Sequence, residues 1–277
     1  RAGMKITSAT KVLGVIGDPV AHSLSPIMHN GWIADHGFDA VYVALQLQSE
    51  DAEHDIRALK GLGFTGLNVT LPHKEAAAKA ADRSEDVVAN TLRWEEDGTL
   101  SAFNTDGAGF LDALTEAAPD WADRVRRVLI VGAGGAGLAI GKALSPRMET
   151  VRFVNRTAVR AEAAAATLHN GRTLPWEALE EGFAEADLIV QATSLGLAGA
   201  EALQWPVARC RDAAIVADIV YRPLETQLLR AARARGLTSM DGLGMLIHQG
   251  ARAFELWFGV KPSAAKARAR LEAALSP

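Results

Sequence analysis

The sequence is poor in cysteine and carries no marked excess of either charge. Cys210 is its only cysteine, so no disulfide can form within the chain, and this scarcity is typical of a reducing compartment. The 29 Lys and Arg residues nearly balance the 33 Asp and Glu residues, which leaves a net charge of -4. Because this balance supplies no broad cationic field, we predict a small-molecule partner and no nucleic acid.

Long apolar runs and metal-binding clusters are missing as well. The longest uncharged, mostly apolar stretch runs from Val128 to Gly141 and is shorter than the roughly 18 residues that span a bilayer. The beginning of the chain has no apolar segment long enough for a signal peptide. The 7 histidines are scattered, without an H-E-x-x-H motif or a Cys/His cluster. We therefore expect a cytoplasmic protein with no membrane partner and no metal.

The chain is rich in short β-branched runs that alternate with alanine-rich helical stretches. Hydrophobic residues make up 49% of the 277 positions, which excludes disorder and collagen-like repetition. The alternation predicts the α/β class, with parallel strands joined by helical crossovers, and the length allows two domains, although one large α/β domain also fits. We expect strands at residues 12–16, 40–45, 66–70, 127–131, 151–154, 188–192 and 214–219.

Two helices have recognisable ends. Ser25 is a candidate N-cap before Pro26, and Gly37 closes that helix. A second helix is expected at residues 49–60, with acidic residues in its first turns, basic residues near its end, and Gly61 as the residue that stops it.

A glycine-rich turn lies between the strongest strand and a helix. In RVLIVGAGGAGLAI, Gly132 permits a tight turn, Gly134 lets the backbone approach a diphosphate, and Gly137 allows close helix packing. The N-terminus of the helix would then hold the diphosphate. This context predicts a Rossmann-type doubly wound dinucleotide-binding domain; the alternative is a glycine turn that binds nothing.

The end of the next strand favours NADP over NAD. An NAD site places Asp or Glu there, whereas this chain reads Asn155-Arg156-Thr157, with Arg160 following. Guanidinium groups match the geometry of a phosphate dianion, so Arg156 and Arg160 are candidates for the 2'-phosphate of NADP. The alternative is that both arginines are solvated at a strand-helix junction.

Four small polar clusters precede residue 110 and suggest a small polyol as the substrate. Each has a local explanation as well, as a helix cap or a satisfied strand end, and Asp106 could cap a helix that starts at Ala108. The clusters are Ser23 to Ser25, Asn68 to Lys74, Asn90 with Thr91, and Asn104 to Gly107.

Lys74 is the strongest candidate for proton transfer. If Pro72 is the first helical residue, Lys74 lies in the first turn, where the helix dipole disfavours a cation. Because a lysine at this position lowers the stability of the helix, its presence there makes it a candidate general acid or base. The alternative is a flexible surface lysine.

Six ordered motifs resemble those of the shikimate dehydrogenase family. They are GVIGDPVAHSLSPIMHN, LNVTLPHKEAA, NTDGAGF, VGAGGAG with NRT, DIVYRPLETQLL and DGLGMLIHQGARAFELW. The likeness extends from Val12 to Trp257. It implies reversible, NADPH-dependent reduction of 3-dehydroshikimate to shikimate in chorismate and aromatic amino acid biosynthesis. It also implies an N-terminal α/β substrate domain beside the Rossmann-type domain, with the active site in the cleft between them.

The resemblance also implies domain bounds and roles for individual residues. Residues 4–106, completed by 242–277, would form the substrate-binding catalytic domain, and residues 107–241 the NADP-binding domain. Lys74 and Asp106 match the family's catalytic pair. Substrate contacts fall to Ser23, Ser25, Asn68, Thr70, Asn90, Tyr221 and Gln249. Cofactor contacts fall to Gly132, Ala133, Gly134, Gly135, Ala136, Asn155, Arg156, Thr157, Arg160, Ile219 and Gly242.

The chain departs from the family pattern in two places, and two other functions fit the same motifs. The segment between Lys74 and Asn90 is shorter than usual, and LPHK replaces the commoner VPFK-like sequence. A quinate or aminoshikimate dehydrogenase of the same family would use nearly the same residues. A non-catalytic NADPH-binding sensor would need only the cofactor residues, although Lys74 and Asp106 argue against it. Both a monomer and a homodimer are compatible with the sequence.

Replacing Arg156 by Asp together with Arg160 by Ala should raise the KM for NADPH steeply, because the 2'-phosphate loses two cationic partners. The KM for NADH should stay nearly unchanged. Initial rates with each cofactor measure this difference, and an equal loss with both cofactors would contradict the assignment.

Overall fold

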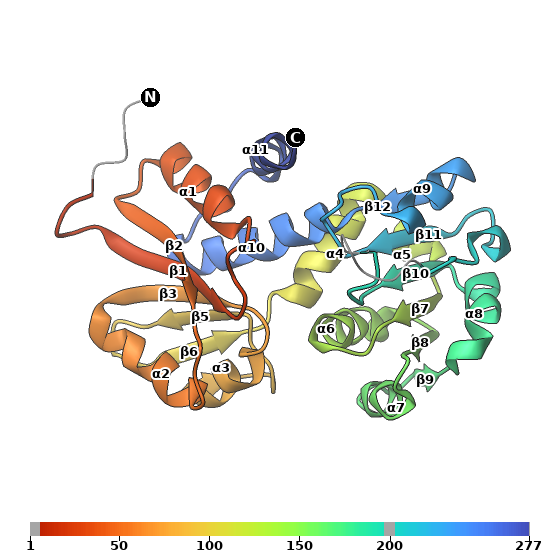
Figure 1. Ribbon diagram of the computed structural model, residues 1–277, viewed down its shortest axis with the longest axis horizontal. Helices are drawn as coiled ribbons and strands as arrows, with labels where there is room; N and C mark the ends of the chain where they lie inside the picture. The colour runs from red at the N-terminus through yellow and green to blue at the C-terminus, as the bar shows by residue number, and fades with distance from the viewer. Residues whose placement is uncertain (1–5, 197–202, 277) are drawn as a thin grey trace. The chain divides into compact units, whose positions relative to one another are not determined.

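The computed structural model describes residues 6–196 and 203–276 and divides the chain into two compact units (Figure 1). Unit 1 comprises Arg1–Thr105 and Gln249–Pro277, and unit 2 comprises Asp106–His248. The chain therefore leaves unit 1 after Thr105 and returns to it at Gln249. Within the described ranges, no helix combines the length and the apolar character needed to cross a membrane.

Unit 1 is built on a mixed sheet of 6 strands in the order β2-β1-β3-β5-β6-β4. The first three of these run parallel, whereas β5 is antiparallel to both β3 and β6. Its strands are β1 (Lys11–Gly17), β2 (Ala40–Gln46), β3 (Phe64–Val69), β4 (Arg83–Ser84), β5 (Thr91–Trp94) and β6 (Leu100–Phe103). Its helices are α1 (Ser25–His36), α2 (Ala52–Ala58), η1 (Leu59–Leu62), α3 (Lys74–Ala80) and α11 (Ala264–Leu275), with the end of α10 (Gly242–Phe258).

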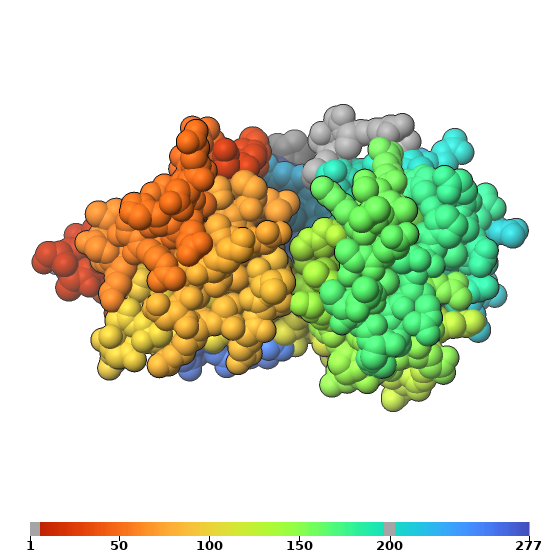
Figure 2. Space-filling model, turned by 90° about the horizontal axis from the view of Figure 1, so that it is seen from below, coloured from red at the N-terminus to blue at the C-terminus, as the bar shows by residue number. Residues whose placement is uncertain are grey.

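Helices cover both faces of the unit 1 sheet. Leu67 and Val69 of β3 join the apolar cluster that includes Ile56 of α2 and Ala77 of α3. Asn68 lies between them and points to the opposite face, because side chains alternate along a strand. On that face the rings of α1, β2 and α10 pack together. Figure 2 shows, in orange, the surface of unit 1 that contains α2 and α3.

Unit 2 contains a fully parallel sheet of 6 strands in the order β12-β11-β10-β7-β8-β9. Counted from β7, this is the 3-2-1-4-5-6 order of dinucleotide-binding domains. The predicted α/β class and Rossmann-type domain are confirmed. The strands are β7 (Arg127–Val131), β8 (Thr150–Val154), β9 (Gly171–Thr173), β10 (Leu188–Gln191), β11 (Ile215–Asp218) and β12 (Thr238–Met240). The helices are α4 (Asp106–Ala117), α5 (Trp121–Arg124), α6 (Gly135–Leu144), η2 (Ser145–Arg147), α7 (Ala158–Ala166), η3 (Trp176–Ala178), α8 (Leu179–Glu185), η4 (Val207–Arg209), α9 (Gln227–Ala234) and the start of α10.

The central strands of unit 2 are buried on both faces. In β7, Val128 and Ile130 join the cluster that contains side chains of α4 and α6. Leu129 and Val131 join the second cluster, which contains side chains of α8 and α9. Burial on both faces explains why these strands read as continuous apolar runs in the sequence.

All seven expected strands occur, but two helix starts differ from the prediction. The N-cap of α1 is Leu24, and Ser25 is the first helical residue, because the hydroxyl of Ser23 accepts the backbone N–H of Ser25 at 3.2 Å. Helix α3 begins at Lys74 instead of Pro72, since a turn in which the His73 N–H bonds to the Thr70 carbonyl at 3.1 Å precedes it.

Two further helix limits were also predicted wrongly. The helix expected at residues 49–60 is α2 followed by η1, and it ends at Gly63, not Gly61. Gly63 has φ 81, a left-handed conformation that glycine adopts without steric cost, and its N–H bonds to the Lys60 carbonyl. Asp106 is the first residue of α4 instead of a cap before Ala108, in a first turn where the helix dipole favours a carboxylate.

Candidate active site

A buried chain of hydrogen bonds joins several predicted substrate residues of unit 1. The Asn68 side-chain oxygen accepts a hydrogen bond from the Tyr42 hydroxyl at 2.7 Å. The Asn68 amide nitrogen donates to the Asn90 carbonyl and to the Thr91 hydroxyl, both at 3.1 Å. Asn68 and Thr91 meet because they are paired residues of β3 and β5. The Asn68 amide thus uses both hydrogens within the protein and keeps one acceptor position for a ligand hydroxyl.

Asn90 connects three segments of unit 1. Its side-chain oxygen accepts the Thr105 backbone N–H at 2.8 Å and the Thr91 hydroxyl at 3.1 Å. Its nitrogen donates to the Thr105 hydroxyl at 2.9 Å and to Gln249 Oε1 at 3.2 Å. The shortened segment after Lys74 therefore still brings Asn90 beside Asn68 and Gln249.

The two serines lie at the start of α1, close to the same network. Ser25 is buried and Ser23 is half-buried. Burial raises the pKa of Tyr42 well above its usual range, while a hydrogen bond with Ser25 acts in the opposite direction. The Tyr42 hydroxyl thus links Ser25 to Asn68 and stays protonated. Tyr42 was not among the residues predicted from the sequence.

Lys74 and Thr70 lie on either side of the turn between β3 and α3. Thr70 directly follows β3, and its N–H bonds to the Ile16 carbonyl at 2.9 Å. Lys74 opens α3 as a half-buried side chain, and its carbonyl accepts the Ala89 N–H at 2.9 Å. This backbone bond holds the start of α3 against the residue that precedes Asn90.

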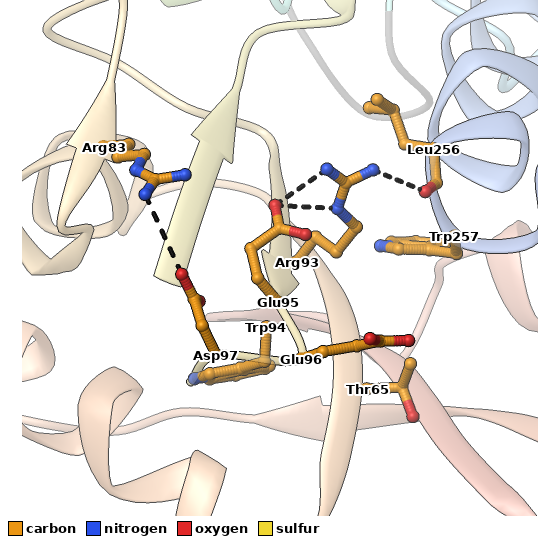
Figure 3. A pocket seen from close by; sticks show the side chains of 9 residues that line it. All are labelled: Thr65, Arg83, Arg93, Trp94, Glu95, Glu96, Asp97, Leu256 and Trp257. Atoms are coloured by element: carbon orange, nitrogen blue, oxygen red, sulfur yellow. Dashed lines mark hydrogen bonds and ion pairs between the residues drawn. The ribbon is translucent and has the colours of Figure 1, made fainter. Parts of the chain in front are cut away.

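The end of α10 is fixed to β5 at a hollow of about 620 Å³ (Figure 3). Arg93 donates to the Leu256 carbonyl at 2.9 Å and forms a two-pronged ion pair with Glu95. The Trp257 indole donates to the Leu92 carbonyl at 2.9 Å. Since a Cβ on Gly66 would lie 2.2 Å from the indole nitrogen, glycine is required there. These contacts hold the helix that carries Gln249.

The glycine turn of unit 2 has the features that a diphosphate cradle needs. Gly132 has φ 112, and a Cβ on it would lie 2.7 Å from the Ala192 carbonyl oxygen. A Cβ on Gly137 would lie 2.2 Å from the Gly132 oxygen, so α6 packs directly against the turn. At Gly134 and Gly135, by contrast, an added Cβ meets nothing within 4 Å among the described residues. The turn is therefore tight where it packs and open where a ligand would approach.

A hollow of about 230 Å³ lies at the carboxyl end of β8. The Asn155 side chain accepts the Ala133 N–H at 3.2 Å and donates to the Thr157 carbonyl at 3.0 Å, so it ties the hollow to the glycine turn. The hollow brings together four of the predicted cofactor residues. It is lined by Asn155, Arg156, Thr157, Arg160, Trp176, Thr193, Ser194 and Leu195.

The segment after β11 carries two further predicted residues of unit 2, Ile219 and Tyr221, and is held by a buried carboxylate. Asp218 accepts the Val220 N–H at 2.9 Å and the Thr226 hydroxyl at 2.7 Å. Burial raises the pKa of Asp218 to about 6, although both hydrogen bonds oppose this shift. Burial also raises the pKa of Tyr221.

Gly242 and Asp106 each lie at the start of a closely packed helix in unit 2. A Cβ on Gly242 would lie 2.3 Å from the Ile219 carbonyl oxygen, so α10 begins in contact with the segment after β11. A Cβ on Gly107, next to Asp106, would lie 2.5 Å from the Ala139 oxygen of α6. Asp106 is buried and belongs, like Tyr221, to unit 2.

Tyr42 and Asp218 hold segments of the candidate site in place and were missed by the sequence analysis, which named Thr91 only as a member of a polar cluster. Tyr42 and Thr91 both bond to Asn68, a partner distant from each in the chain, whereas Asp218 bonds to Val220 and Thr226. Of the three, only Thr91 could have been recognised as a candidate from the sequence, because its hydroxyl directly follows the amide of Asn90 at the start of a strand.

Cys210 is buried, and burial raises the pKa of its thiol to about 11, which agrees with an inert cysteine. Within the described residues, no group of three or more His, Cys, Asp or Glu side chains is arranged to hold a metal ion.

The parallel sheet with its glycine turn defines unit 2 as a dinucleotide-binding domain of the α/β class, joined to a second α/β unit with a buried amide network. Three family models match successive parts of the chain. They are the shikimate dehydrogenase substrate binding domain at residues 15–91, shikimate / quinate 5-dehydrogenase at 116–221, and the shikimate 5'-dehydrogenase C-terminal domain at 242–272. The chain belongs to the shikimate dehydrogenase family.

Individual relatives agree with this membership. A protein of Mesorhizobium japonicum named shikimate dehydrogenase (NADP(+)) is 45% identical over 98% of this chain and 99% of its own length. A shikimate dehydrogenase structure in complex with NADP+ superposes with a TM-score of 0.89 at 34% identity, covering 100% of both chains. The Thermus thermophilus enzyme in complex with NADP(H) and shikimate gives a TM-score of 0.83 at 36% identity, with 96% and 100% of the chains covered. Quinate dehydrogenase from Corynebacterium glutamicum in complex with NAD gives 0.88 at 31% identity, with 95% and 99% covered.

Replacing Asp218 by Asn should change how the stability of unit 2 depends on pH. The folded carboxyl holds its proton more tightly than the unfolded one, so its stabilisation is full below about pH 4 and is lost as the pH rises through about 6. Relative to the Asn variant, the wild-type free energy of unfolding should therefore fall by about 3 kcal/mol in total from well below pH 4 to well above pH 6. Urea unfolding at pH values on both sides, followed by tryptophan fluorescence, measures the difference, and a constant difference would contradict it.

Proposed function

We propose that this chain is an NADP-dependent oxidoreductase that interconverts 3-dehydroshikimate and shikimate, with the place in aromatic amino acid biosynthesis that this reaction implies. The observation that carries the proposal is the match over 98% of the chain to a relative named shikimate dehydrogenase (NADP(+)). The sequence contains Lys74 and Asp106 as well as a complete glycine turn, which supports an enzyme in preference to a binding protein.

The residues of unit 2 fit NADP. The open backbone at Gly134 and Gly135, at the N-terminus of α6, suits a diphosphate, because the first N–H groups of a helix attract anions. We assign Gly132 to Ala136 to the diphosphate and Asn155 to Arg160 to the adenosine ribose with its 2'-phosphate. Ile219 and Gly242 are assigned to the nicotinamide side. When bound, the reduced cofactor supplies the hydride for the carbonyl carbon.

The chain's own contribution to the reaction is proton transfer and orientation. As charge grows on the carbonyl oxygen of 3-dehydroshikimate, a donor within hydrogen-bond reach must neutralise it. We assign the donor to Lys74 Nζ, which in the reverse direction accepts the proton of the shikimate hydroxyl. Asp106 is assigned to orient Lys74 and that hydroxyl. Thr105, immediately before Asp106, donates its backbone N–H to the Asn90 side chain. This bond restricts the position of the backbone that carries the Asp106 carboxylate.

Recognition of the substrate is assigned to groups of matching chemistry. The hydroxyls of Ser23 and Ser25 are donors suited to the carboxylate. The ring and its hydroxyls are assigned to Asn68, Thr70, Asn90, Tyr221 and Gln249. Because both amide hydrogens of Asn68 are used internally, its side-chain oxygen would accept a hydrogen bond from a ring hydroxyl, and this polarity disfavours ligands with an acceptor at that position.

A quinate dehydrogenase activity is the second candidate, because a quinate dehydrogenase aligns over 95% of the chain. That structure holds NAD, whereas the Arg156 and Arg160 pair of this chain suits a 2'-phosphate. We place the reaction in the cytoplasm, in keeping with a single, buried cysteine.

The absorbance of the reduced nicotinamide tests substrate and cofactor together. Shikimate and quinate are each combined with NADP and with NAD, and we expect the highest kcat/KM for shikimate with NADP. A higher value for quinate would replace the proposal by the second candidate. NADPH binding without turnover of either substrate would instead indicate a sensor.

Replacing Lys74 by Ala should lower kcat by about a hundredfold or more, with a KM for shikimate within about threefold of wild type, since the proton donor acts in the transition state. Steady-state kinetics at one pH measure both parameters. The matched control is Lys79→Ala, which removes an exposed lysine from the same helix. Near-normal turnover of the Lys74 variant would transfer the role to another group.

A further inference from the structure

Trp176 lies beside the cofactor residues, although no motif of the sequence points to it. It opens η3 and is half-buried, with its indole packed on the cluster that contains Leu179 and Phe183. The guanidinium carbon of Arg156 lies 5.5 Å from the centroid of the indole ring. This distance is within the range of a cation–π interaction.

The sheet brings these two side chains together. Phe153 of β8 and Thr173 of β9 are paired residues, and the Leu174 N–H extends the ladder to the Phe153 carbonyl at 3.0 Å. Arg156 follows Phe153 by as many positions as Trp176 follows Thr173. Because the two strands are parallel, both side chains leave the sheet at its carboxyl edge, where ligands bind in such folds.

Arg156 and Trp176 both line two neighbouring hollows. The hollow of about 230 Å³ also contains Thr157 and Arg160. The hollow of about 260 Å³ also contains the carboxylates Glu162 and Glu177. A guanidinium that contacts the face of an indole can still donate hydrogen bonds from its edge to a phosphate.

Arg156 is exposed, so an unrestrained side chain would lose rotamer freedom whenever it binds an anion. Contact with the rigid indole restricts that freedom before the ligand arrives. We propose that Trp176 is a positioning residue that holds Arg156 for the 2'-phosphate of NADP, and that it thereby contributes to selectivity for NADP over NAD. The inference rests on the proposed function and names a determinant of its cofactor choice.

Equilibrium binding to the whole protein tests the inference without turnover. The probes are NADP and NAD, together with the fragments adenosine 2',5'-bisphosphate and AMP. Trp176→Leu should weaken NADP and the bisphosphate about three- to fivefold, the size of an exposed cation–π interaction, and leave NAD and AMP within about twofold. Trp176→Phe keeps an aromatic face and should restore most of the affinity.

Trp205→Leu is the matched control. Trp205 is another half-buried tryptophan of unit 2 that packs on the same cluster, and its ring faces Phe183 at 6.1 Å between centroids. Its loss should leave all four affinities unchanged, and both leucine variants should show a similar fall in Tm.

Three results would overturn the role of Trp176. The first is an equal loss of affinity for NADP and for NAD in Trp176→Leu. The second is the same loss of affinity in Trp205→Leu. The third is an effect of Trp176→Leu on affinity that is as large in an Arg156→Gln background as in the wild type. In each of these the wild type still prefers the bisphosphate to AMP, so the proposed function stands. A wild type without that preference would overturn the NADP assignment and the role of Trp176 together.

Discussion

The requirement that a buried amide satisfy all of its hydrogen-bonding groups organises unit 1 around Asn90. Leaving one such group unpaired in the interior costs about 1–3 kcal/mol, so each partner of the carboxamide is held in a defined place. The partners come from β5, from the residue before α4 and from α10. Segments distant in the sequence are thus brought together at one side chain, and Asn68 joins them through the Asn90 carbonyl.

The unit 2 sheet shows which part of the fold can be predicted from the sequence. Strand β7 occupies the residues expected for it, because a strand buried on both faces is apolar throughout and is recognisable without knowledge of its neighbours. Strands β5 and β6 of unit 1 were missed, since each is short and β5 carries Arg93, whose partners Glu95 and Leu256 become visible only in the folded chain. Ser25 was wrongly expected to be the N-cap, because it is the first residue of the helix and donates its own N–H to the Ser23 hydroxyl.

The candidate site, like the fold, has one part that can be predicted from the sequence and another that cannot. The glycine turn and the arginines after β8 are local in sequence; the backbone of the turn is open at Gly134 and Gly135, and the arginines line one hollow. The groups that hold a site in place act across the fold, so no spacing reveals them. Asp218, which pairs with Thr226, and Tyr42, which pairs with Asn68, are ordinary residues in the sequence and gain their significance from a partner on another segment.

The division of the chain also has a consequence for its synthesis. Unit 1 is discontinuous: Trp257, which bonds to β5, and Phe254, which packs on Trp32 of α1, both follow the whole of unit 2. A nascent chain therefore carries a sheet with one face covered only by α1, without the rings of α10, throughout the translation of unit 2. Apolar surface exposed during that interval is prone to aggregation, and a chain that ended before Phe254 would never cover it completely.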